Sequence, residues 1–404
     1  MKTVSVVGAG FAGLSVSLKL AQKGFQVDLY ESSSRVGGLL GTDTTEHGIA
    51  ERAANALIRT SKAEDLFNEL GLKPSLPLAS AKKRFLFRKK PRTWPLSFSE
   101  TLGLICRVLP KLLKGKTSLK PQSQETLEQW GLRLLGPAAT QHILGPAMQG
   151  IYGNEISGLS ASVILGPLFS KKKKDKYQGL LTGPGGMQDL VDHLEAKLKE
   201  LGVRIHLNTS VNARELKGPV IIATSASAAC RLLKESHPSL SQVLSEIRMS
   251  SLMSVTLFFN KAQTTYQGFG CLIPRGYGLK SLGVLMNSYI FADRNKTYNE
   301  TWMMGGEKEQ DLLSFSDSDL LKLIADERFR ILGHKESLLD YRINRWDKAL
   351  PYYDLQLEKT LELLKSMLPA KELYLHGNYL GGIGLSKILE RSEVLAEEIA
   401  SRYA

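Results

Sequence analysis

The sequence predicts an α/β protein that combines a discontinuous nucleotide-binding domain, an α+β domain built on a sheet, and a helical insertion. Three observations support this prediction. Residues 3–30 read as strand, glycine turn, helix and strand. Strand-like segments separated by glycine-rich turns fill residues 250–305, and residues 96–116 are apolar with basic residues interleaved. With 404 residues, the chain is long enough for more than one domain.

The nucleotide-binding domain is expected to be Rossmann-like, because its opening elements alternate between buried strand and helix. Segments with the required periodicity occur at residues 3–7, 12–23, 25–30, 187–201, 204–207, 219–223 and 385–403. We therefore assign residues 1–80, 177–237 and 366–404 to this domain. Residues 81–95 and 238–365 are expected to form the α+β domain that binds the substrate, and residues 96–176 the helical insertion.

The strongest local motif is Gly8-Ala9-Gly10-Phe11-Ala12-Gly13, which follows a strand and opens a helix. Its first glycine permits a tight turn, the second allows close approach of a pyrophosphate, and the third allows close helix–strand packing. Phe11 and Ala12 begin the helix, whose free N–H groups would face the phosphates. Glu31 lies 18 residues after Gly13, where it can accept hydrogen bonds from a ribose.

This fingerprint does not separate NAD from FAD. A second glycine pair in Arg35-Val36-Gly37-Gly38 favours FAD, because it resembles the extended motif of the glutathione-reductase and amine-oxidase flavoproteins. Arg35 and the amides of Gly37 and Gly38 would bring further donors towards the phosphates. A plain surface turn is the alternative interpretation.

The segment from His376 to Leu385 is rich in glycine and precedes the last helix. A helix N-terminus at this place could stabilise a reduced, anionic flavin. Asn378 is a candidate for contact with the flavin, whereas His376 is expected to be structural. Further cofactor contacts are expected at Gly382, Ile383 and Gly384.

The net charge of +13 is compatible with nucleic acid, an anionic membrane surface or an acidic ligand. Of these three partners, nucleic acid is the least favoured, since no zinc-ligand spacing, helix-turn-helix pattern or ribonucleoprotein motif occurs in the sequence. No metal site is expected. The three cysteines lie far apart, which indicates no disulfide framework and fits a reducing compartment such as the cytoplasm. Glycines inside the first apolar stretch argue against a signal peptide, and no apolar run is long enough to span a bilayer.

Nearly the whole chain resembles the FAD-dependent protoporphyrinogen or coproporphyrinogen oxidases. The matching stretches are residues 84–87, 150–153, 159–160, 185–190, 268–275, 282–285, 305–306, 345–346 with Pro351, and 377–384. The resemblance implies FAD-dependent oxidation of a porphyrinogen in haem biosynthesis, with hydride transfer to flavin N5 and O2 as the final acceptor giving H2O2. It also implies that Arg84 grips a substrate propionate and that the backbone of Val211 contacts adenine. A solvated residue within Lys82-Lys83-Arg84 is the alternative for Arg84.

The chain departs from that family's pattern at three places. These are Ala53-Ala54-Asn55 in place of a Gly-Pro pair, Ser386 in place of an aspartate, and Tyr352-Tyr353-Asp354 without a following Gly-His. Two other functions stay open. One is a flavin amine oxidase or carotenoid-type desaturase, although all three cysteines precede residue 272 and none lies near the tail. The other is a catalytically silent FAD-binding partner or haem-trafficking protein.

Residues 96–116 have the pattern of a basic amphipathic helix that lies in a membrane interface, and the corresponding region docks on membranes in some members of that family. A core-facing helix with a solvated basic side fits equally well. Pro110 is expected to interrupt the helix. The protein is therefore expected in the cytoplasm, with peripheral contact to the inner face of the cell membrane if this segment docks. The Lys171–Lys174 run is expected to be a solvated loop, and a homodimer is compatible with the sequence.

Overall fold

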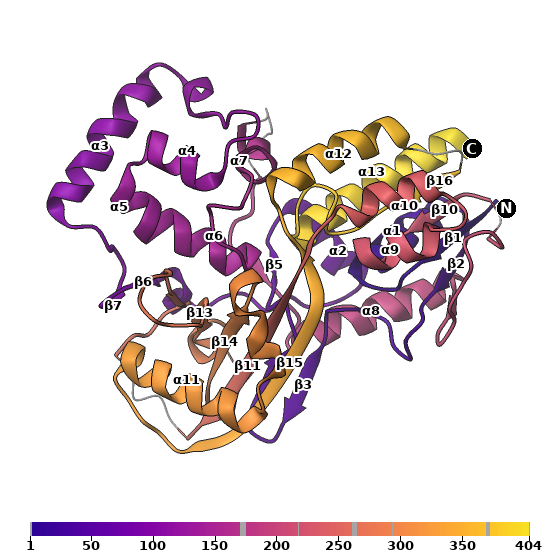
Figure 1. Ribbon diagram of the computed structural model, residues 1–404. Coiled ribbons are helices and arrows are strands. Elements are labelled where there is room, and N and C mark those ends of the chain that lie inside the picture. The colour runs from indigo at the N-terminus through magenta and orange to yellow at the C-terminus, as the bar shows by residue number, and fades with distance from the viewer. Residues whose placement is uncertain are drawn as a thin grey trace.

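The protein is described by a computed structural model that covers residues 2–169, 175–216, 218–260, 265–292, 294–368 and 372–403. The Lys171–Lys174 run lies outside these residues. Figure 1 shows a helical part that projects from the rest, a nucleotide-binding part that contains both chain ends, and a sheet-based part below them. The predicted α/β class, with a Rossmann-like discontinuous domain, an α+β domain and a helical insertion, is confirmed.

The nucleotide-binding part is built on a five-stranded parallel sheet. Its strands, in spatial order, are β16 (Leu373–Leu375), β10 (Val220–Ile222), β1 (Thr3–Val7), β2 (Gln26–Tyr30) and β9 (Arg204–His206). Each neighbouring pair is parallel, so all five strands end at the same edge. Segments from the beginning, middle and end of the chain therefore meet in one sheet. Ligands of such sheets bind at the carboxyl edge of the strands.

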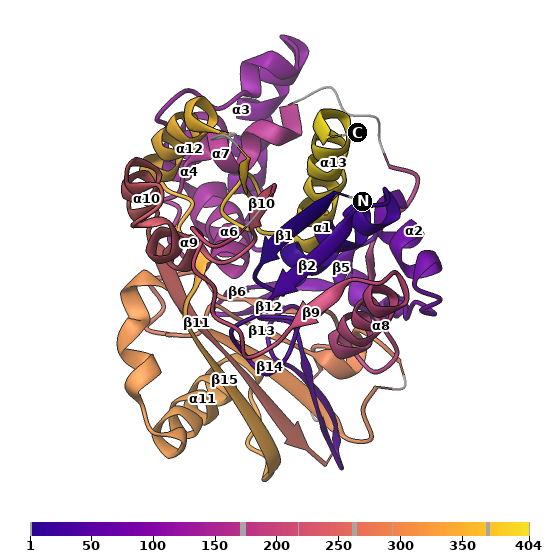
Figure 2. The same cartoon turned by 90° about the vertical axis from the view of Figure 1, so that its right-hand side faces the viewer.

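Helices cover both faces of this sheet (Figure 2). They are α1 (Phe11–Gln22), α2 (Ser61–Glu69), α8 (Met187–Glu200), α9 (Ala226–Leu233), α10 (Pro238–Ser245), α12 (Leu355–Met367) and α13 (Leu385–Tyr403). Helix α1 contacts both α8 and α13. It is apolar on nearly every side because it lies between these helices and the sheet, with Leu14, Val16 and Leu18 completely buried.

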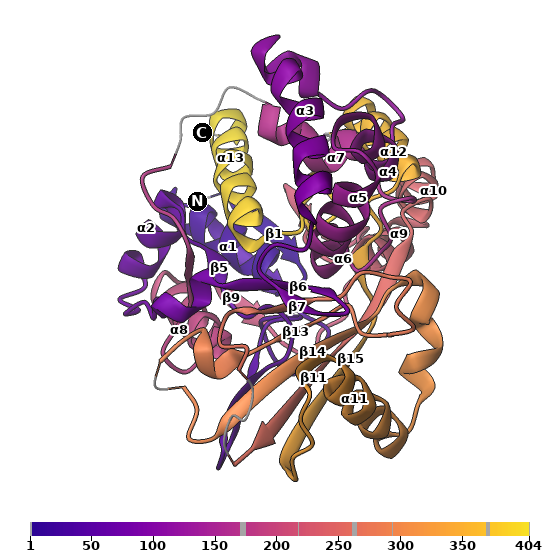
Figure 3. The same cartoon turned by 90° about the vertical axis from the view of Figure 1, so that its left-hand side faces the viewer.

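The second sheet has seven strands. In spatial order they are β15 (Leu338–Pro351), β11 (Met249–Phe259), β14 (Tyr298–Gly305), β13 (Gly283–Leu285), β12 (Gly270–Leu272), β6 (Arg84–Arg88) and β7 (Lys90–Arg92). All pairs are antiparallel except β6 with β12. Helix α11 (Asp317–Leu332) lies beside β11 and β15 in Figure 3, and its Leu320 and Ile324 share a core with the completely buried Trp302. The strand-like segments expected at residues 255–259, 282–286 and 301–304 correspond to β11, β13 and β14. Strands β11 and β14 are longer than expected, and β13 is one residue shorter at each end.

Two short two-stranded sheets connect these parts. They pair β3 (Thr42–Thr45) with β4 (Gly48–Glu51), and β5 (Leu57–Ile58) with β8 (Leu180–Leu181). The helical insertion contains α3 (Phe98–Leu113), α4 (Leu127–Leu134), α5 (Pro137–Ala139), α6 (Gly145–Tyr152) and α7 (Ala161–Leu165). Within the part of the chain that the structure describes, no helix combines the length and the apolar character needed to cross a membrane.

Helix α3 begins with a capping box, in which the Ser97 hydroxyl accepts from the Glu100 N–H and the Glu100 carboxylate accepts from the Ser97 N–H. Hydrogen bonds from the Arg88 guanidinium lower the pKa of Glu100 to about 2 and anchor the helix to β6. The expected interruption at Pro110 was wrong, because α3 continues to Leu113. Proline lies in the last turn, where it removes only one intrahelical bond.

The alternative that α3 faces the core was also wrong. None of its described residues is buried, and Phe98 and Leu113 are 87% and 81% exposed. Figure 1 shows the helix at the outer side of the helical part, where one of its sides contacts α5 and the row from Phe98 to Leu113 is exposed. An exposed apolar row of this size is unusual on a monomer and indicates contact with another surface.

Candidate functional site

The first glycine turn has the geometry that a dinucleotide site requires. Gly8 has a φ of +100° and donates its N–H to the carbonyl of Tyr30 at 2.8 Å. A Cβ atom on Gly13 would lie 1.8 Å from the oxygen of Gly8, so only glycine permits α1 to approach the turn this closely. Gly10 is the N-cap of α1 and supplies no capping side chain. The N–H groups at the start of α1 are thereby left for another acceptor.

The Glu31 carboxylate lies against this turn. One oxygen accepts from the Ala9 N–H at 2.8 Å, and the other accepts from the N–H and hydroxyl of Ser33, both at 2.9 Å. An ionised carboxylate has about four acceptor positions. Glu31 is therefore held in place by the backbone and keeps capacity for a ribose hydroxyl.

The second glycine pair packs directly on the first turn and is not a detached surface turn. Gly37 donates its N–H to the carbonyl of Ala9 at 2.8 Å. A Cβ on Gly38, whose φ is +60°, would lie 3.0 Å from the Cα of Gly10. Together the two turns present backbone amides without side chains in between, which is the arrangement that cradles phosphates.

Arg35 lies differently from the expectation that its guanidinium faces the phosphates. It donates instead to three carbonyls of its own loop, those of Val36, Gly38 and Leu40, at 3.1, 2.6 and 2.9 Å. This arrangement fixes the shape of the second turn. The contribution of Arg35 to a cofactor site in this structure is therefore to hold the loop.

The tail segment lies at the same edge of the sheet. His376 continues the ladder by donating its N–H to the carbonyl of Ile222, and a Cβ on Gly377 would lie 3.3 Å from the carbonyl of Thr224. A Cβ on Gly8 would also meet Thr224, at 2.9 Å. The structure thus brings the two predicted glycine segments together although more than 350 residues separate them.

The other tail candidates are held by the second domain. Tyr353 follows β15, and its hydroxyl donates to the carbonyl of Asn378 while accepting from the N–H of Gly382 at 2.8 Å. The Asn378 side chain lies 3.4 Å from the carbonyl of Ala349. Gly384 accepts from Ile388 in the first turn of α13. The loop ahead of α13 is therefore shaped by both domains.

Val211 lies on the segment after β9, and two residues earlier Thr209 donates its N–H to the carbonyl of Glu31 at 2.8 Å. The side chains of Val211 and Ile383 are partly buried and pack on the same core cluster as Val7. Both candidates thus belong to the core on the side of the sheet that includes Val7 of β1.

Arg84 stands apart from these residues, in the seven-stranded sheet. It begins β6, pairs with Gly270 of β12, and is exposed. Its guanidinium lies 4.9 Å from the centre of the Phe269 ring. An exposed cation over an aromatic face can still bind a carboxylate. The structure places no described carboxylate in an ion pair with Arg84.

The three departures from the family pattern have structural roles. Asn55 lies 3.5 Å from Asn287 across the two domains. Ser386 donates its hydroxyl to the carbonyl of Ile58 at 2.6 Å, which ties α13 to β5. Asp354 caps α12 by accepting from the N–H of Leu357 at 2.7 Å.

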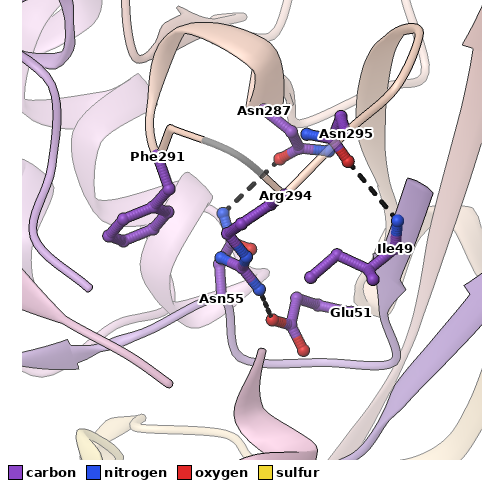
Figure 4. A pocket seen from close by; sticks show the side chains of 7 residues that line it. All are labelled: Ile49, Glu51, Asn55, Asn287, Phe291, Arg294 and Asn295. Atoms are coloured by element: carbon purple, nitrogen blue, oxygen red, sulfur yellow. Dashed lines mark hydrogen bonds and ion pairs between the residues drawn. The ribbon is translucent and has the colours of Figure 1, made fainter. Parts of the chain in front are cut away.

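A buried ion pair that the sequence did not reveal joins the two domains (Figure 4). Glu51 and Arg294 have side chains only 6% and 5% exposed. Glu51 also accepts from Thr42 at 2.6 Å and from the N–H of Met187, the first residue of α8. Burial raises the pKa of Glu51. No local pattern marks the pair, because 243 residues separate its members.

The pair lines a small polar pocket of about 10 Å³, which has room for no more than a water molecule. Its lining residues are Ile49, Glu51, Asn55, Asn287, Phe291, Arg294 and Asn295. None of the predicted cofactor residues is among them. The pocket therefore marks the seam between the domains and is too small for a cofactor or a tetrapyrrole.

The parallel sheet, the two glycine turns and the acid after β2 define a dinucleotide-binding protein, and the residues present fit FAD. The backbone of Gly10 and Gly38 is bare, and the start of α1 offers uncapped N–H groups. The family profile described as flavin containing amine oxidoreductase matches residues 11–213. The chain belongs to this family and is an FAD-dependent oxidoreductase.

Relatives match nearly the full chain. The mitochondrial protoporphyrinogen oxidase of Nicotiana tabacum is 25% identical over 96% of this chain and 92% of its own. The coproporphyrinogen III oxidase of Bacillus subtilis (strain 168) is 21% identical over 98% and 97%. The resemblance to porphyrinogen oxidases stated from the motifs is thereby confirmed.

Solved structures share the fold. One from Exiguobacterium sp. 255-15, provisionally described as a protoporphyrinogen oxidase, has a TM-score of 0.79 at 19% identity and covers 99% of both chains. A reduced UDP-galactopyranose mutase has a TM-score of 0.76 at 12% identity, with 99% and 94% covered. The same fold therefore carries different chemistries, and the fold alone does not select a substrate.

Proposed function

We propose that this protein oxidises a porphyrinogen, protoporphyrinogen IX or coproporphyrinogen III, to the porphyrin in haem biosynthesis, with O2 as the final acceptor and H2O2 as its product. The observation that carries the proposal is similarity over 96% or more of the chain to relatives that bear these names. A flavin amine oxidase or a catalytically silent FAD-binding partner is the alternative.

FAD, when bound, supplies the hydride acceptor, so this chain's own residues bind, orient and exclude water. The N–H groups at the start of α1 and the bare backbone of Gly10 and Gly38 would hold the pyrophosphate, Gly37 would fix the second turn through its N–H bond to Ala9, and Glu31 would hold the ribose. Val211 would contact adenine. Asn378 and residues 382–384 would border the flavin. Substrate oxidation of this kind depends on positioning, which accounts for the lack of any acid–base motif in the sequence.

Arg84 is the candidate that positions the substrate. Arg84 is the first residue of β6, in the seven-stranded sheet, and its side chain is exposed. A porphyrinogen carries propionate groups, which a guanidinium binds through paired N–H donors. The Phe269 ring, 4.9 Å away, would offer an apolar surface beside that contact.

Anaerobic mixing of the FAD-loaded protein with each porphyrinogen tests the proposal directly. We expect the visible absorbance of the flavin to bleach, and H2O2 to form when air is admitted. The substrate that bleaches faster is the preferred one. If the protein stays yellow with both porphyrinogens, the proposal fails; bleaching by amines would then favour an amine oxidase, and no bleaching at all the silent partner.

Replacing Arg84 by alanine is expected to raise KM by roughly ten- to a hundredfold, since a hydrogen bond to a charged group is worth about 1.5–3 kcal/mol. FAD content should stay that of the unaltered protein, because Arg84 lies outside the nucleotide sheet. Steady-state kinetics and flavin absorbance measure the two quantities. Lys82→Ala, an exposed neighbour, is the control and should change neither. Loss of flavin from the Arg84 variant would refute this role.

We also propose that α3 rests on an anionic membrane surface. Its exposed apolar residues include Phe98, Leu102, Ile105, Leu109 and Leu113, with exposures from 51% to 87%. The exposed Arg107 and Lys114 are interleaved with them in the sequence, which complements acidic headgroups, whereas Lys111 donates to the carbonyl of Arg133. Since no helix of the described residues spans a bilayer, contact would be peripheral.

The double variant Ile105→Glu/Leu109→Glu should lose binding to vesicles that contain phosphatidylglycerol. Each exposed apolar side chain that enters lipid contributes about 1.5–3 kcal/mol, so the loss should be roughly a hundredfold or more. Vesicle co-sedimentation measures it. Leu363→Glu is the matched control, because Leu363 is 52% exposed on α12. Equal sedimentation of all three proteins would contradict the proposal.

A further inference from the structure

Arg391, near the start of α13, joins the two ends of the tail loop, defined here as residues 377–384. Its Nη2 donates to the carbonyl of Gly377 at 2.6 Å. Both Nη atoms lie 3.4 Å from the carbonyl of Gly382. One side chain thus contacts both ends of the loop, and Tyr353 contacts the same loop at Asn378 and Gly382.

The Arg391 guanidinium makes its described hydrogen bonds to loop carbonyls, and the charge of the adjacent Glu390 also acts on it. The adjacent Glu390 forms its ion pair with Lys387, at 2.9 Å. The Nε atom of Arg391 is buried and has no hydrogen-bond partner in the described structure. Burial lowers the pKa of Arg391. Arg391 is thus a partly buried cation whose guanidinium is directed at backbone carbonyls of the tail loop.

The buried side chains around Arg391 are neutral. His376 has its Nε2 atom 2.8 Å from the Ser392 hydroxyl, and burial together with the charge of Arg391 lowers its pKa to about 3. Burial raises the pKa of Tyr353 and of Tyr379, so neither phenol is ionised near neutral pH. Among Arg391, His376, Tyr353 and Tyr379, the guanidinium of Arg391 is therefore the group that is charged near neutral pH.

Only a thin layer of backbone separates Arg391 from the outer surface of the tail loop. Gly381 and Gly382 have φ values of +92° and +130° and carry no side chain. A Cβ on either would lie 4.0 or 3.8 Å from Nη1 of Arg391. In a medium of low effective dielectric, a charge at this depth acts strongly on a group bound to the outside of the loop.

We propose that Arg391 clamps the tail loop and holds a positive charge behind it, so that the site binds reduced, anionic flavin more tightly than oxidised flavin. The proposal rests on the proposed FAD site at this loop. A fixed cation lowers the free energy of the form that carries the negative charge, which raises the reduction potential of the bound flavin. Arg391 is a positioning residue, separated from the flavin by the loop.

The FAD-loaded variant Arg391→Met tests this inference, because methionine removes the charge and retains an unbranched side chain. We expect the ratio of the two dissociation constants, oxidised over reduced, to fall roughly tenfold, which is about 30 mV for a two-electron couple. Equilibration with a reference dye measures the potential. Arg391→Lys keeps the charge and should stay within about threefold of the unaltered protein, a difference of less than 1 kcal/mol.

Arg402→Met is the matched control, because Arg402 lies near the other end of α13, 3.3 Å from the Tyr374 hydroxyl. It should leave the ratio unchanged. If the Arg391→Met variant does not fold, the Arg391→Gln variant is used instead, because the glutamine amide can still donate a hydrogen bond to a loop carbonyl.

The outcomes separate this inference from the proposed function. An unchanged ratio in a neutral, FAD-loaded Arg391 variant would overturn the inference while leaving the FAD site intact. A lowered ratio in the neutral variant, with the lysine variant and the control unchanged, would establish it. Unaltered protein that stays colourless with excess FAD would overturn both.

Discussion

Gly13→Ala is expected to abolish stable FAD binding. The added Cβ would lie 1.8 Å from the carbonyl oxygen of Gly8, and both atoms belong to rigid backbone. Either α1 or the glycine turn must move, which withdraws the N–H groups at the start of α1 from the phosphates. Each hydrogen bond to a charged group contributes about 1.5–3 kcal/mol, so the loss of one or two weakens FAD binding by roughly tenfold to ten-thousandfold.

Flavin content after purification and titration with FAD measure this effect, and urea unfolding reports the cost of the displaced helix. Gly103→Ala is the matched control. Gly103 lies in α3 with no heavy atom near its missing Cβ, so alanine there should leave FAD binding unchanged and stabilise the helix by about 0.5–1 kcal/mol. Full flavin content in the Gly13 variant would show that α1 does not border the cofactor.

Glu51→Ala should destabilise the protein by about 3–5 kcal/mol, the usual cost of leaving a buried charge without its partner. Arg294, with a side chain 5% exposed, loses its carboxylate, and the N–H of Met187 at the start of α8 loses an acceptor. The pair joins β4 of the nucleotide-binding part to the segment before β14. The variant should therefore also loosen the contact between the two domains.

Urea unfolding followed by circular dichroism measures the free energy. Glu200→Ala is the control: Glu200 is 65% exposed in its pair with Lys197, so its loss should cost at most about 1 kcal/mol. Glu51→Met combined with Arg294→Met should recover part of the stability, because no charge is then left unpaired. A Glu51 variant as stable as the control would mean that solvent reaches Arg294.

Local patterns in the sequence were sufficient for the nucleotide-binding elements. The last helix begins and ends where predicted, and α1 differs from the predicted helix by one residue at each end. Glycine turns and apolar periodicity are local properties, since they depend on backbone conformations and on side chains a few residues apart. The same holds for the strands β11, β13 and β14, although β11 and β14 are longer than the segments expected and β13 is shorter.

Such local patterns do not predict which distant segments of the chain pair as strands. Strand β15 has no continuous apolar pattern and is mostly half-exposed, and it forms along β11. The parallel pairing of β6 with β12 brings Arg84 beside Gly270. Neither partner carries a local signal of the other, because strand pairing is stabilised by tertiary contacts.

For α3, the sequence revealed an apolar face and a basic face but not their surroundings. Two interpretations fitted the same residues, and the structure contradicts the core-facing one, because none of the described residues of α3 is buried. Burial depends on the neighbouring elements that pack against a helix. Periodicity contains no information about those neighbours.

By itself, the sequence determined a flavin-type dinucleotide site, because each glycine and the acid of that site are required by backbone geometry within about thirty residues. Tertiary structure alone decided how charge is distributed around it. The pairing of Glu51 with Arg294, the exposure of α3 and the contacts of Arg391 with the tail loop all depend on how the folded elements are placed relative to one another. The energy of a charge depends on its burial and its partners, and both exist only after folding.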